Sequence, residues 1–473
     1  MDDSTGRRHD GTLVERVMQA VHGRIASRAL APGARLPSIR ALARALQVSN
    51  STVVEAYDRL AAEGLIRSRP GSGFYHAGPL APLSLAELAP RLDRAIDPFW
   101  VSRLSLEAGG EVLKPGCGWL PGAWMPEEEI RRALRALARA RDGTGLTDYG
   151  SPLGLAPLRR FLSRRMAEQG FRATPEGILL TDSGTQAIDL VCRLLIQPGD
   201  AVLVDDPCYF NFLALLRAHR ATVIGVPHTP AGPDLRLFER ALSEHRPRLY
   251  ITNSGIHNPT GAALSPATAH RLLKLVESHD LVVVEDDIFA DFETEPAPRL
   301  AALDGLDRVV RIGSFSKTLS ASFRCGYIAA RPDWIEKLTD IRIATGFASN
   351  RLSEELVLAV LGSGGYRKHM EALRARLAGA MAGTIPRLRA LGIEPWIEPG
   401  AGMFAWCRLP GGLDAAAVAR HALAQGVILA PGNVFSPSQT AAGFMRFNVA
   451  QCGDERVFAV LEKAMRGLVS GQA

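Results

Sequence analysis

"GSFSKTLSASFRCGY", residues 313–327, decides both the fold and the chemistry expected of this chain. Lys317 stands among serines directly after the apolar run "RVVRI", and Arg324 follows seven positions later. Lysine is scarce, since only six of the 55 basic residues are lysines. Arginine is always protonated, whereas a buried lysine can lose its proton and become a nucleophilic amine. The placement of Lys317 therefore indicates an aldehyde partner.

Length and composition describe an ordinary globular protein. With 473 residues, two or three domains are expected, and 47% hydrophobic and 22% charged residues are typical of that class. No apolar run reaches the roughly 18 to 20 residues that span a bilayer, and the first residues lack the apolar core of a secretion signal. The six cysteines form no CxxC pair, which suits a reducing compartment and argues against a metal framework. We therefore expect a cytoplasmic protein without a metal site.

Positive charge is concentrated at the front of the chain. Residues 1–78 hold eleven arginines and seven acids, hence +4, which leaves +2 of the net +6 for the remainder. Between Arg16 and Val54 there are six arginines and no acid. Such a run could be only a solvated face, so the surrounding pattern has to decide.

The pattern of residues 1–78 is that of a small helical module with a wing. "LVERVMQAVHGRIASRAL" has apolar residues at helical spacing, "IRALARALQV" predicts a second helix, and "SNSTVVEAYDRLAAEGL" predicts a third, capped by Ser49 or Ser51. "IRSRPGSGFYHA" predicts two short strands around a glycine-rich tip. Together these elements make a winged helix-turn-helix. A protein-docking module with a basic surface is the alternative.

Residues 32–77 resemble the GntR-type DNA-binding domain along nearly its whole length. Their sequence is "PGARLPSIRALARALQVSNSTVVEAYDRLAAEGLIRSRPGSGFYHA". The resemblance implies that residues 49–52 begin a recognition helix in the major groove and that the wing follows the adjacent groove. Arginine forks bind phosphates bidentately, and helix N-termini favour anions. The expected partner is double-stranded promoter or operator DNA. The expected contact residues are Arg35, Ser38, Arg40, Ser49, Asn50, Ser51, Thr52, Arg67, Arg69, Gly71 and Gly73.

The remainder of the chain indicates an α/β domain behind a joint. "GPLAPLSLAELAPRLDRAIDPFW" fits a partly helical linker over residues 79–99. From residue 100, continuous apolar runs such as "AVLVDD", "LVVVEDD" and "RVVRIGS" alternate with helical segments. Continuous runs are typical of strands covered on both faces, so a mostly parallel sheet is expected, with ligands at its strand ends. The expected domains are therefore 1–78, a linker 79–99, and 100–473.

Residues from about 110 to 470 resemble the aminotransferases of fold-type I, which use pyridoxal 5'-phosphate (PLP). The resemblance rests on "SFSK", "TDSGTQAIDLVCRLL", "VVVEDD", "HNPTG", "DDPCYF" and "GFMRFNVA". It implies a mostly parallel sheet covered by helices, a small C-terminal subdomain, and Lys317 as the residue that forms the cofactor's aldimine. An isolated lysine would more often be a surface charge, but the serines, the preceding strand and Arg324 favour this role.

The resemblance also assigns the side chains around the cofactor. Asp286 would pair with the pyridine nitrogen and keep it protonated, so that the ring can withdraw electrons. Asn258 would bond the phenolic oxygen, and Tyr209 would stack on the ring. Arg446 would grip the α-carboxylate of an effector or substrate, although an edge-strand salt bridge is the simpler alternative. The expected phosphate-binding residues are Ser183, Gly184, Thr185, Ser314 and Arg324, with Tyr149 reaching the partner subunit's phosphate.

Two positions depart from the family pattern. Phe289 stands where a tyrosine usually contacts the phenolic oxygen, and Ala321-Ser322 replaces the usual Pro-Gly between lysine and arginine. The first change removes a hydroxyl that helps to set the pKa of the aldimine. The second alters the backbone beside the phosphate.

A GntR-type reader joined to an aminotransferase-like domain resembles the MocR/GabR-type transcription regulators. The resemblance implies a head-to-tail homodimer in which an amine, an amino acid or a B6 vitamer acts through the Lys317 aldimine and changes how the DNA-binding heads are presented. One alternative is an active aminotransferase with an accessory DNA-binding head. Another is a cofactor-free scaffold that only binds DNA. The effector, the operator and the sign of regulation are not encoded in any motif.

Overall fold

The computed structural model describes residues 12–27, 30, 33–63, 65–69, 72–77, 98–139 and 147–470. Contacts divide the chain into two compact units, Met1–Leu88 and Ala89–Ala473. Most of the expected linker, 79–99, lies outside the described residues, so its boundaries stay a prediction. The expected wing residue Gly71 also lies outside them, as does the side chain of Arg69.

The small unit is three helices followed by a two-stranded wing, as the sequence predicts. Its centre is formed by Val17, Val53, Tyr57 and Leu60, which are fully buried. The Tyr57 hydroxyl donates to Pro37 O at 2.9 Å, and its ring meets Phe74 of the wing edge-on at 4.9 Å between centroids. These contacts hold the wing against the third helix. The elements are α1 (Leu13–Ala26), α2 (Ile39–Leu46), α3 (Asn50–Ala62), β1 (Ile66–Arg69) and β2 (Gly73–His76).

The large unit is built on an eight-stranded sheet whose order is β3-β10-β9-β8-β7-β4-β5-β6. The pairs from β9 through β8, β7 and β4 to β5 are parallel, whereas β10 is antiparallel to both β9 and β3. The apolar runs of the sequence thus became the parallel centre of the sheet. Its strands are β3 (Ile178–Thr181), β4 (Ala201–Asp206), β5 (Thr222–Thr229), β6 (Gly232–Pro233), β7 (Leu249–Thr252), β8 (Val282–Asp286), β9 (Val309–Ser314) and β10 (Gly326–Ala329).

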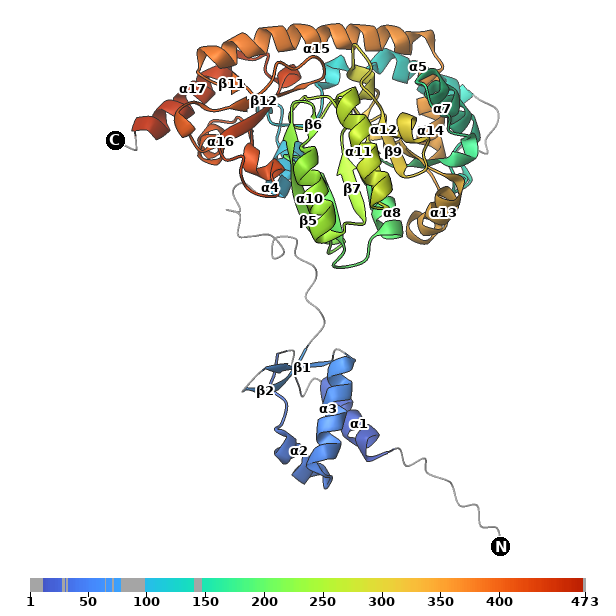
Figure 1. The fold of residues 1–473 in the computed structure, drawn as a ribbon, viewed down its shortest axis with the longest axis vertical. Coiled ribbons are helices and arrows are strands. Elements are labelled where there is room, and N and C mark those ends of the chain that lie inside the picture. Colours follow the sequence, from blue (N-terminus) through green and yellow to red (C-terminus); the bar gives the residue numbers. More distant parts are fainter. Residues whose placement is uncertain are drawn as a thin grey trace. The chain divides into compact units, whose positions relative to one another are not determined.

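Helices cover the sheet, which is why its central strands can be apolar throughout. Figure 1 shows α10 and α11 over one face, and α15 running along one side of the unit. The two buried clusters centred on Tyr250 and on Ile251 lie on opposite faces of β7, because successive side chains of a strand alternate. The helices are α4 (Pro98–Glu107), α5 (Glu127–Arg139), α7 (Ala156–Glu168), α8 (Gly184–Leu195), α9 (Phe210–Ala218), α10 (Leu235–His245), α11 (Pro266–Ser278), α12 (Leu300–Asp304), α13 (Pro332–Gly346), α14 (Arg351–Leu361), α15 (Gly364–Ala390), α16 (Ala415–Leu423) and α17 (Glu455–Ser470).

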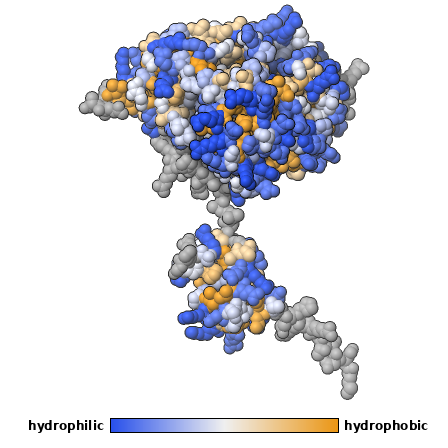
Figure 2. Space-filling view, in the orientation of Figure 1, coloured by the Kyte–Doolittle hydropathy of each residue, from blue (hydrophilic) through white to orange (hydrophobic). Residues whose placement is uncertain are grey.

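A smaller antiparallel sheet, ordered β11-β12-β14-β13, forms the expected C-terminal subdomain. Its apolar core includes Cys407, Met445 and Phe447, all fully buried. In the space-filling view, polar and charged side chains cover much of the visible surface of the large unit (Figure 2). No helix among the described residues is long and apolar enough to cross a membrane. The strands are β11 (Glu394–Pro395), β12 (Phe404–Arg408), β13 (Ala430–Pro431) and β14 (Phe444–Asn448).

Candidate functional site

The candidate site lies where β7, β8 and β9 reach the same edge of the sheet. Asn253 follows β7, Asp286 ends β8, and Ser314 ends β9 three residues before Lys317. Because the three strands are parallel, their carboxyl ends meet, as ligand sites in such sheets do. Asn253 Nδ2 donates to the carbonyl of Asp286 at 2.8 Å and ties the first two strand ends together.

Lys317 is a partly buried amine whose Nζ donates to Gly118 O at 2.6 Å. Burial lowers its pKa to about 8, and the positive charges of Arg446 and Arg324 act in the same direction, against the opposing effect of Cys117 and Asp286. It opens into a cavity of about 620 Å³ that is also lined by Trp119, Met125 and Gln451. A substantial fraction of neutral amine near neutral pH and an adjacent cavity are what a carbonyl-binding lysine requires.

Asp286 faces the same site as a buried carboxylate that is short of partners. Burial raises its pKa to about 7; the N–H of Ile288, 3.3 Å from Oδ1, opposes this shift, and Asp287 adds to it. Within the described part of the chain, no basic side chain lies within 4 Å of this carboxylate. A protonated ring nitrogen would supply the positive partner that the pocket lacks.

The two acids beside Asp286 have structural roles on the other side of the strand. Glu285 accepts from Leu300 N at 2.7 Å and Ala301 N at 2.9 Å. Asp287 pairs with Arg299 at 2.8 Å and Arg311 at 2.6 Å. The alternation of side chains along β8 therefore separates the middle carboxylate from its neighbours. All three carboxylates are buried, so they do not form a solvated strand end.

The N-terminus of α8 lies beside the ends of β8 and β9. Ser183 is its N-cap and accepts from Gln186 N at 3.0 Å. A Cβ placed on Gly184 would stand 3.4 Å from Ile288 Cγ2 and 3.7 Å from Ser314 Cβ, so the start of α8 lies close to both strand ends. The free N–H groups of a helix N-terminus favour an anion. The expected phosphate-binding residues Ser183, Gly184 and Ser314 are thus brought together.

Two further expected phosphate ligands complete this end of the site. Thr185, in the first turn of α8, accepts from Asn211 Nδ2 at 3.3 Å. Arg324 has a left-handed backbone with φ of 46° directly after the 3-10 turn Ala321–Phe323, where the family's usual Pro-Gly is replaced. Its side chain is exposed, and none of the described residues forms an ion pair with it.

Arg446 is a buried guanidinium that forms no ion pair with an acid in the described part of the chain. It is 1% exposed, and it donates from Nη1 to Asn258 Oδ1 at 2.9 Å and from Nη2 to Gly116 O at 2.8 Å. It lies over the rings of Phe404 and Phe435, at 4.3 and 4.7 Å from their centroids, and its Nε is unpaired. Burial lowers its pKa to about 10. A buried charge of this kind is costly until a counter-ion arrives, so the edge-strand salt bridge is not what the described residues form.

The two expected tyrosines lie in different surroundings. Tyr209 is the N-cap residue of α9, and its ring packs against Phe210 and Phe212 at 5.0 and 5.4 Å between centroids. Burial raises the pKa of its hydroxyl; the charge of Arg446 opposes this shift, and that of Asp286 adds to it. Tyr149 is 80% exposed and packs on Phe347, itself 59% exposed. It does not join the cluster around Lys317 in this chain.

Phe289, one of the positions that depart from the family pattern, packs with the buried aromatic ring of Phe404 beside Arg446. It is 3% exposed and meets Phe404 edge-on at 5.5 Å. Phe404 in turn supports the guanidinium of Arg446. The lost tyrosine hydroxyl is therefore replaced by packing that steadies the neighbouring arginine.

In the small unit, serines cap the two helices of the helix-turn-helix. Ser38 accepts from Ala41 N at 3.3 Å at the start of α2, and Ser49 accepts from Thr52 N at 3.1 Å at the start of α3. Ser51 Oγ lies 2.8 Å from Ser49 Oγ. The side chains of Ser49, Asn50, Ser51, Arg40 and Arg67 are exposed, as contacts to a duplex require.

Arg35 is held against the wing. Its backbone bridges Tyr75, and a Cβ on Gly73 would lie 3.4 Å from its Nε. Gly73 itself has φ of 104°, a conformation that few residues other than glycine adopt. The wing glycine thus makes room for the arginine.

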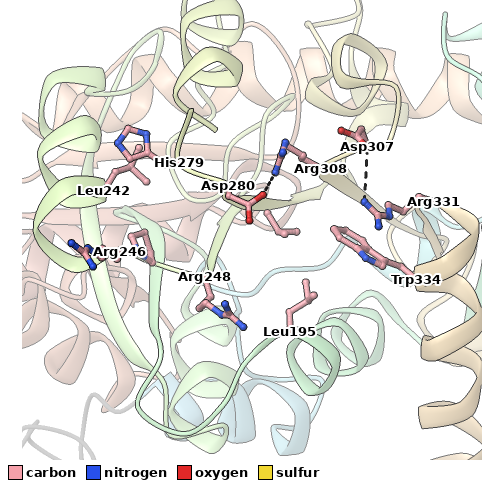
Figure 3. A pocket seen from close by; sticks show the side chains of 12 residues that line it. Leu195, Leu242, Arg246, Arg248, His279, Asp280, Asp307, Arg308, Arg331 and Trp334 are labelled. Carbon is pink, nitrogen blue, oxygen red and sulfur yellow. Dashed lines mark hydrogen bonds and ion pairs between the residues drawn. The ribbon is translucent and has the colours of Figure 1, made fainter. Parts of the chain in front are cut away.

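A second large hollow, of about 660 Å³, lies at the opposite, amino ends of β7, β8 and β9 (Figure 3). Four arginines line it, and two of them form close ion pairs, Arg308 with Asp280 and Arg331 with Asp333. A third arginine, Arg248, has Asp200 at 3.8 Å. Ligands of such sheets bind at the carboxyl ends of the strands, so this hollow at the amino ends does not compete with the Lys317 site.

One group of possible metal ligands is present among the described residues: Asp205, His228 and His257. The two imidazoles are stacked, 3.9 Å between centroids with 14° between planes. His257 Nε2 lies 3.3 Å from Asp205 Oδ2. Asp205 already accepts from the hydroxyls of Tyr250 at 2.6 Å and Thr252 at 2.7 Å. The cluster is a buried hydrogen-bond network that ends at His257, next to Asn258.

The sequence does not predict that residues 116–119 contact both Lys317 and Arg446. The carbonyls of residues 116–119 accept from Arg446, Asn448, Lys317 and Gln451. The stretch "GCGWLPGAW", residues 116–124, is a candidate effector-binding loop, but nothing in it ranks its residues. Backbone carbonyls make these contacts, and a sequence carries no mark of them.

Comparison with known proteins agrees with this geometry. The family model "Aminotransferase class I and II" matches residues 121–463, and "Bacterial regulatory proteins, gntR family" matches residues 13–75. The chain belongs to the aminotransferase class I and II family. Together with its gntR-family region, this is the architecture of MocR-type transcription regulators. The family's fold implies dependence on PLP.

Similar proteins are found among both regulators and enzymes. The uncharacterized HTH-type transcriptional regulator YdcR of Escherichia coli (strain K12) is 28% identical over 450 residues, covering 93% of this chain and 96% of that protein. Aromatic-amino-acid aminotransferase 1 of Thermococcus litoralis is 30% identical over 366 residues, covering 75% and 87%. The structure of the α-aminoadipate aminotransferase LysN from Thermus thermophilus superposes with a TM-score of 0.72 at 28% identity, covering 82% and 100%.

Proposed function

We propose that this protein is a DNA-binding transcription regulator whose aminotransferase-like unit holds PLP on Lys317 and senses an amino compound or a B6 vitamer. The observation that carries the proposal is the group of a partly buried amine (Lys317), a buried carboxylate (Asp286) and a buried guanidinium (Arg446) in the same chain as a capped helix-turn-helix. PLP, when bound, supplies an aldehyde that forms a covalent bond with an amine.

The residues of the site fit PLP by their chemistry. The pKa of Lys317 is lowered to about 8, none of the described basic side chains pairs with Asp286, and the N-terminus of α8 can receive a phosphate. Asn258 and Tyr209 would contact the ring, and Arg324 would add positive charge at the phosphate. Arg446 would bind the carboxylate of an amino-acid effector, because its buried charge has no acid beside it.

The regulator is proposed to act as a homodimer. Tyr149 and Phe347 expose an aromatic pair that a partner subunit could cover, and Tyr149 would then reach that subunit's phosphate group. A head-to-tail arrangement would bring two DNA-binding units onto one operator. Coupling between effector and DNA requires different effector affinities in two arrangements, typically worth about 1–3 kcal/mol.

The test is a DNA titration with defined additions. A DNA sequence selected from a random duplex pool is titrated by fluorescence anisotropy with the full-length protein alone, with PLP, and with PLP plus a panel of amines, amino acids and B6 vitamers. We expect the affinity to change about fivefold or more with PLP or with one class of amino compound. A DNA affinity that is the same under all these conditions contradicts the proposal.

A second candidate function is an active aminotransferase with an accessory DNA-binding unit. It is favoured by the retention of Lys317, Asp286, Asn258 and Arg446 in one site and by the likeness to an enzyme at 30% identity. Incubating the PLP-loaded protein with amino acids and a keto acid distinguishes the two. Many turnovers per site would support the enzyme, whereas release of at most one equivalent of product supports the regulator.

A further inference from the structure

The lining of the cavity beside Lys317 is polar in one segment of the chain and apolar in another. Its serines, and Lys317 itself, come from residues 316–322, whereas residues 113–130 contribute most of its large apolar side chains. Met125 and Ile130 also pack against the main hydrophobic core of the large unit, which supports this part of the wall. A ligand with a polar end and an apolar end would match this division. The apolar side chains are those of Leu113, Trp119, Leu120, Pro121, Met125 and Ile130.

The two charged side chains within the apolar segment already have partners in the protein. Lys114 Nζ donates to Ala108 O at 2.9 Å, just beyond the C-terminus of α4, where a positive charge is favourable. Glu127 accepts from Arg131 Nε at 3.1 Å, one turn further along α5. A charged group on the side chain of a ligand would have to displace one of these contacts or stay without a partner in the cavity. Both are unfavourable, so the cavity favours an apolar group.

Trp119 is held in this wall by its backbone. Its carbonyl accepts from Asn448 Nδ2 at 2.8 Å and from Gln451 Nε2 at 3.2 Å. The next residue, Leu120, is 6% exposed and belongs to the hydrophobic core. None of these contacts uses the indole ring, which lines the cavity. The wall is therefore formed before a ligand binds, which lowers the cost of ordering it on binding.

We propose that this cavity receives the side chain of the effector, and that the effector is a primary amine carrying a bulky apolar group, such as an aromatic ring. Its amine lies at Lys317, and its apolar group lies against Trp119 and Met125. Diamines and amino acids with a second carboxylate bind less well, because their second charge would enter the apolar part of the cavity. Arg446 lies outside this lining, so the preference does not depend on a carboxylate. This inference rests on the proposed function, to which it adds the chemical class of the effector.

The first experiment needs no cofactor, because simple aldehydes condense with Lys317 directly. The amine and an aldehyde form an imine and release one water, and sodium cyanoborohydride then adds hydride to give a stable secondary amine. Full-length, PLP-free protein is treated with acetaldehyde, succinic semialdehyde or hydrocinnamaldehyde at equal concentrations. Mass spectrometry compares the adduct on Lys317 with that on the exposed Lys337. We expect this ratio to be about tenfold higher for hydrocinnamaldehyde than for either other aldehyde. Equal ratios, or a preference for succinic semialdehyde, overturn the proposal.

The second experiment titrates PLP-loaded protein with amines of similar basicity. Ethylamine, butylamine and hexylamine are compared with the diamine and the ω-amino acid of the same length as hexylamine, and binding is followed by the change in cofactor absorbance. The affinity should rise about fourfold for each added methylene of the alkylamines. Hexylamine should bind about tenfold more tightly than either doubly charged compound. An affinity that is independent of chain length contradicts the proposal.

Substitution of Trp119 tests the wall itself. Trp119→Ala removes the ring and keeps the carbonyl that Asn448 and Gln451 hold, so the affinity for hexylamine should fall about tenfold while that for ethylamine stays the same. Trp334→Ala is the matched control, because its ring lines the separate hollow at the amino ends of the strands, and both affinities should be unchanged. Met125→Ala provides the same comparison should Trp119→Ala fail to fold. A wild-type affinity for hexylamine in these variants contradicts the proposal.

The outcomes separate the cavity from the function on which the inference rests. If an amino compound changes the DNA affinity of the PLP-loaded protein but apolar groups give no advantage, the assignment of the cavity is wrong and the proposed function stands. If the protein shows no cofactor absorbance while hydrocinnamaldehyde still selects Lys317, the proposed function fails although the cavity prefers apolar groups.

Discussion

Lys317 and Asp286 are opposite cases of the same physical effect. Burial favours the neutral form of each group, so the pKa of the amine falls to about 8 and that of the carboxyl rises to about 7. At pH 7 about a tenth of the amine is therefore neutral, and about half of the carboxyl is protonated. A cationic ring nitrogen beside Asp286 would restore the carboxylate.

The first prediction concerns the pH dependence of cofactor attachment. A lysine of pKa about 8 has roughly 300 times more neutral amine at pH 7 than one of pKa 10.5. The rate of covalent PLP attachment, followed by stopped-flow absorbance, should rise with pH and level off above about pH 8. A rate that keeps rising tenfold per pH unit to pH 10 would contradict the shifted pKa. Lys317→Ala should show no attachment, whereas Lys114→Ala, in the same cavity, should retain it.

The second prediction concerns the stability of the PLP-free protein. Because the pKa of Asp286 is raised from 3.8 to about 7 by folding, the folded state binds its proton more tightly than the unfolded state. This group therefore reduces the free energy of unfolding as pH rises from about 4 to 7, by at most about 4 kcal/mol. Asp286→Asn removes that cost, so the variant should gain stability relative to wild type across this window.

Urea unfolding of both PLP-free proteins at several pH values measures the difference. The difference in the free energy of unfolding between Asp286→Asn and wild type should be small at pH 4 and largest at pH 7. With PLP bound the order should reverse, because the variant lacks the carboxylate that pairs with the ring nitrogen. A gap that does not change with pH would show that Asp286 is ionised in the folded protein throughout.

At the scale of elements, the sequence predicted most of what defines the fold. The run "AVLVDD" is β4 residue for residue, and Ser49 is the N-cap that its position before α3 indicates. These two predictions succeed for local reasons. A strand buried on both faces requires apolar residues, and the unpaired N–H groups at the start of a helix favour a capping side chain. The partners of Arg446 could not be predicted in this way. Gly116, Phe404 and Asn258 reach it from three distant segments, and only the folded chain brings them together.

The third prediction belongs to the wing and helix surface. Arg67 on β1 is exposed, so its guanidinium can bind a DNA phosphate. Arg59 on α3 instead forms an ion pair with Glu55 at 2.6 Å. Arg67→Ala should weaken DNA binding similarly for all sequences and reduce the slope of log affinity against log salt by about one. Arg59→Ala, the matched control, should leave the slope within error. An unchanged slope in Arg67→Ala would remove the wing from the DNA interface.

At the scale of the whole molecule, the exposed aromatic pair is the feature that a single subunit leaves unexplained. Tyr149 and Phe347 expose 80% and 59% of their surface, and large apolar groups in such positions often mark an interface. The proposed dimer would cover them. It would also make the phosphate end of the site a shared structure.

The fourth prediction tests that interface. Phe347→Asp should shift the protein from dimer to monomer in sedimentation velocity at micromolar concentration and weaken PLP binding, because the partner's contribution to the phosphate would be lost. Leu303→Asp, at a residue exposed to nearly the same degree (58%) on α12, is the control and should leave the dimer intact. If Phe347→Asp remains dimeric, this aromatic pair is not the interface.

The most direct measurement of the central claim is covalent capture of the cofactor. The full-length protein is loaded with PLP, reduced with sodium borohydride, digested and mapped by mass spectrometry. A phosphopyridoxyl adduct on Lys317, and on none of the other five lysines, is the result that the account predicts. An unmodified Lys317, or an adduct at Lys114 in its place, would contradict it.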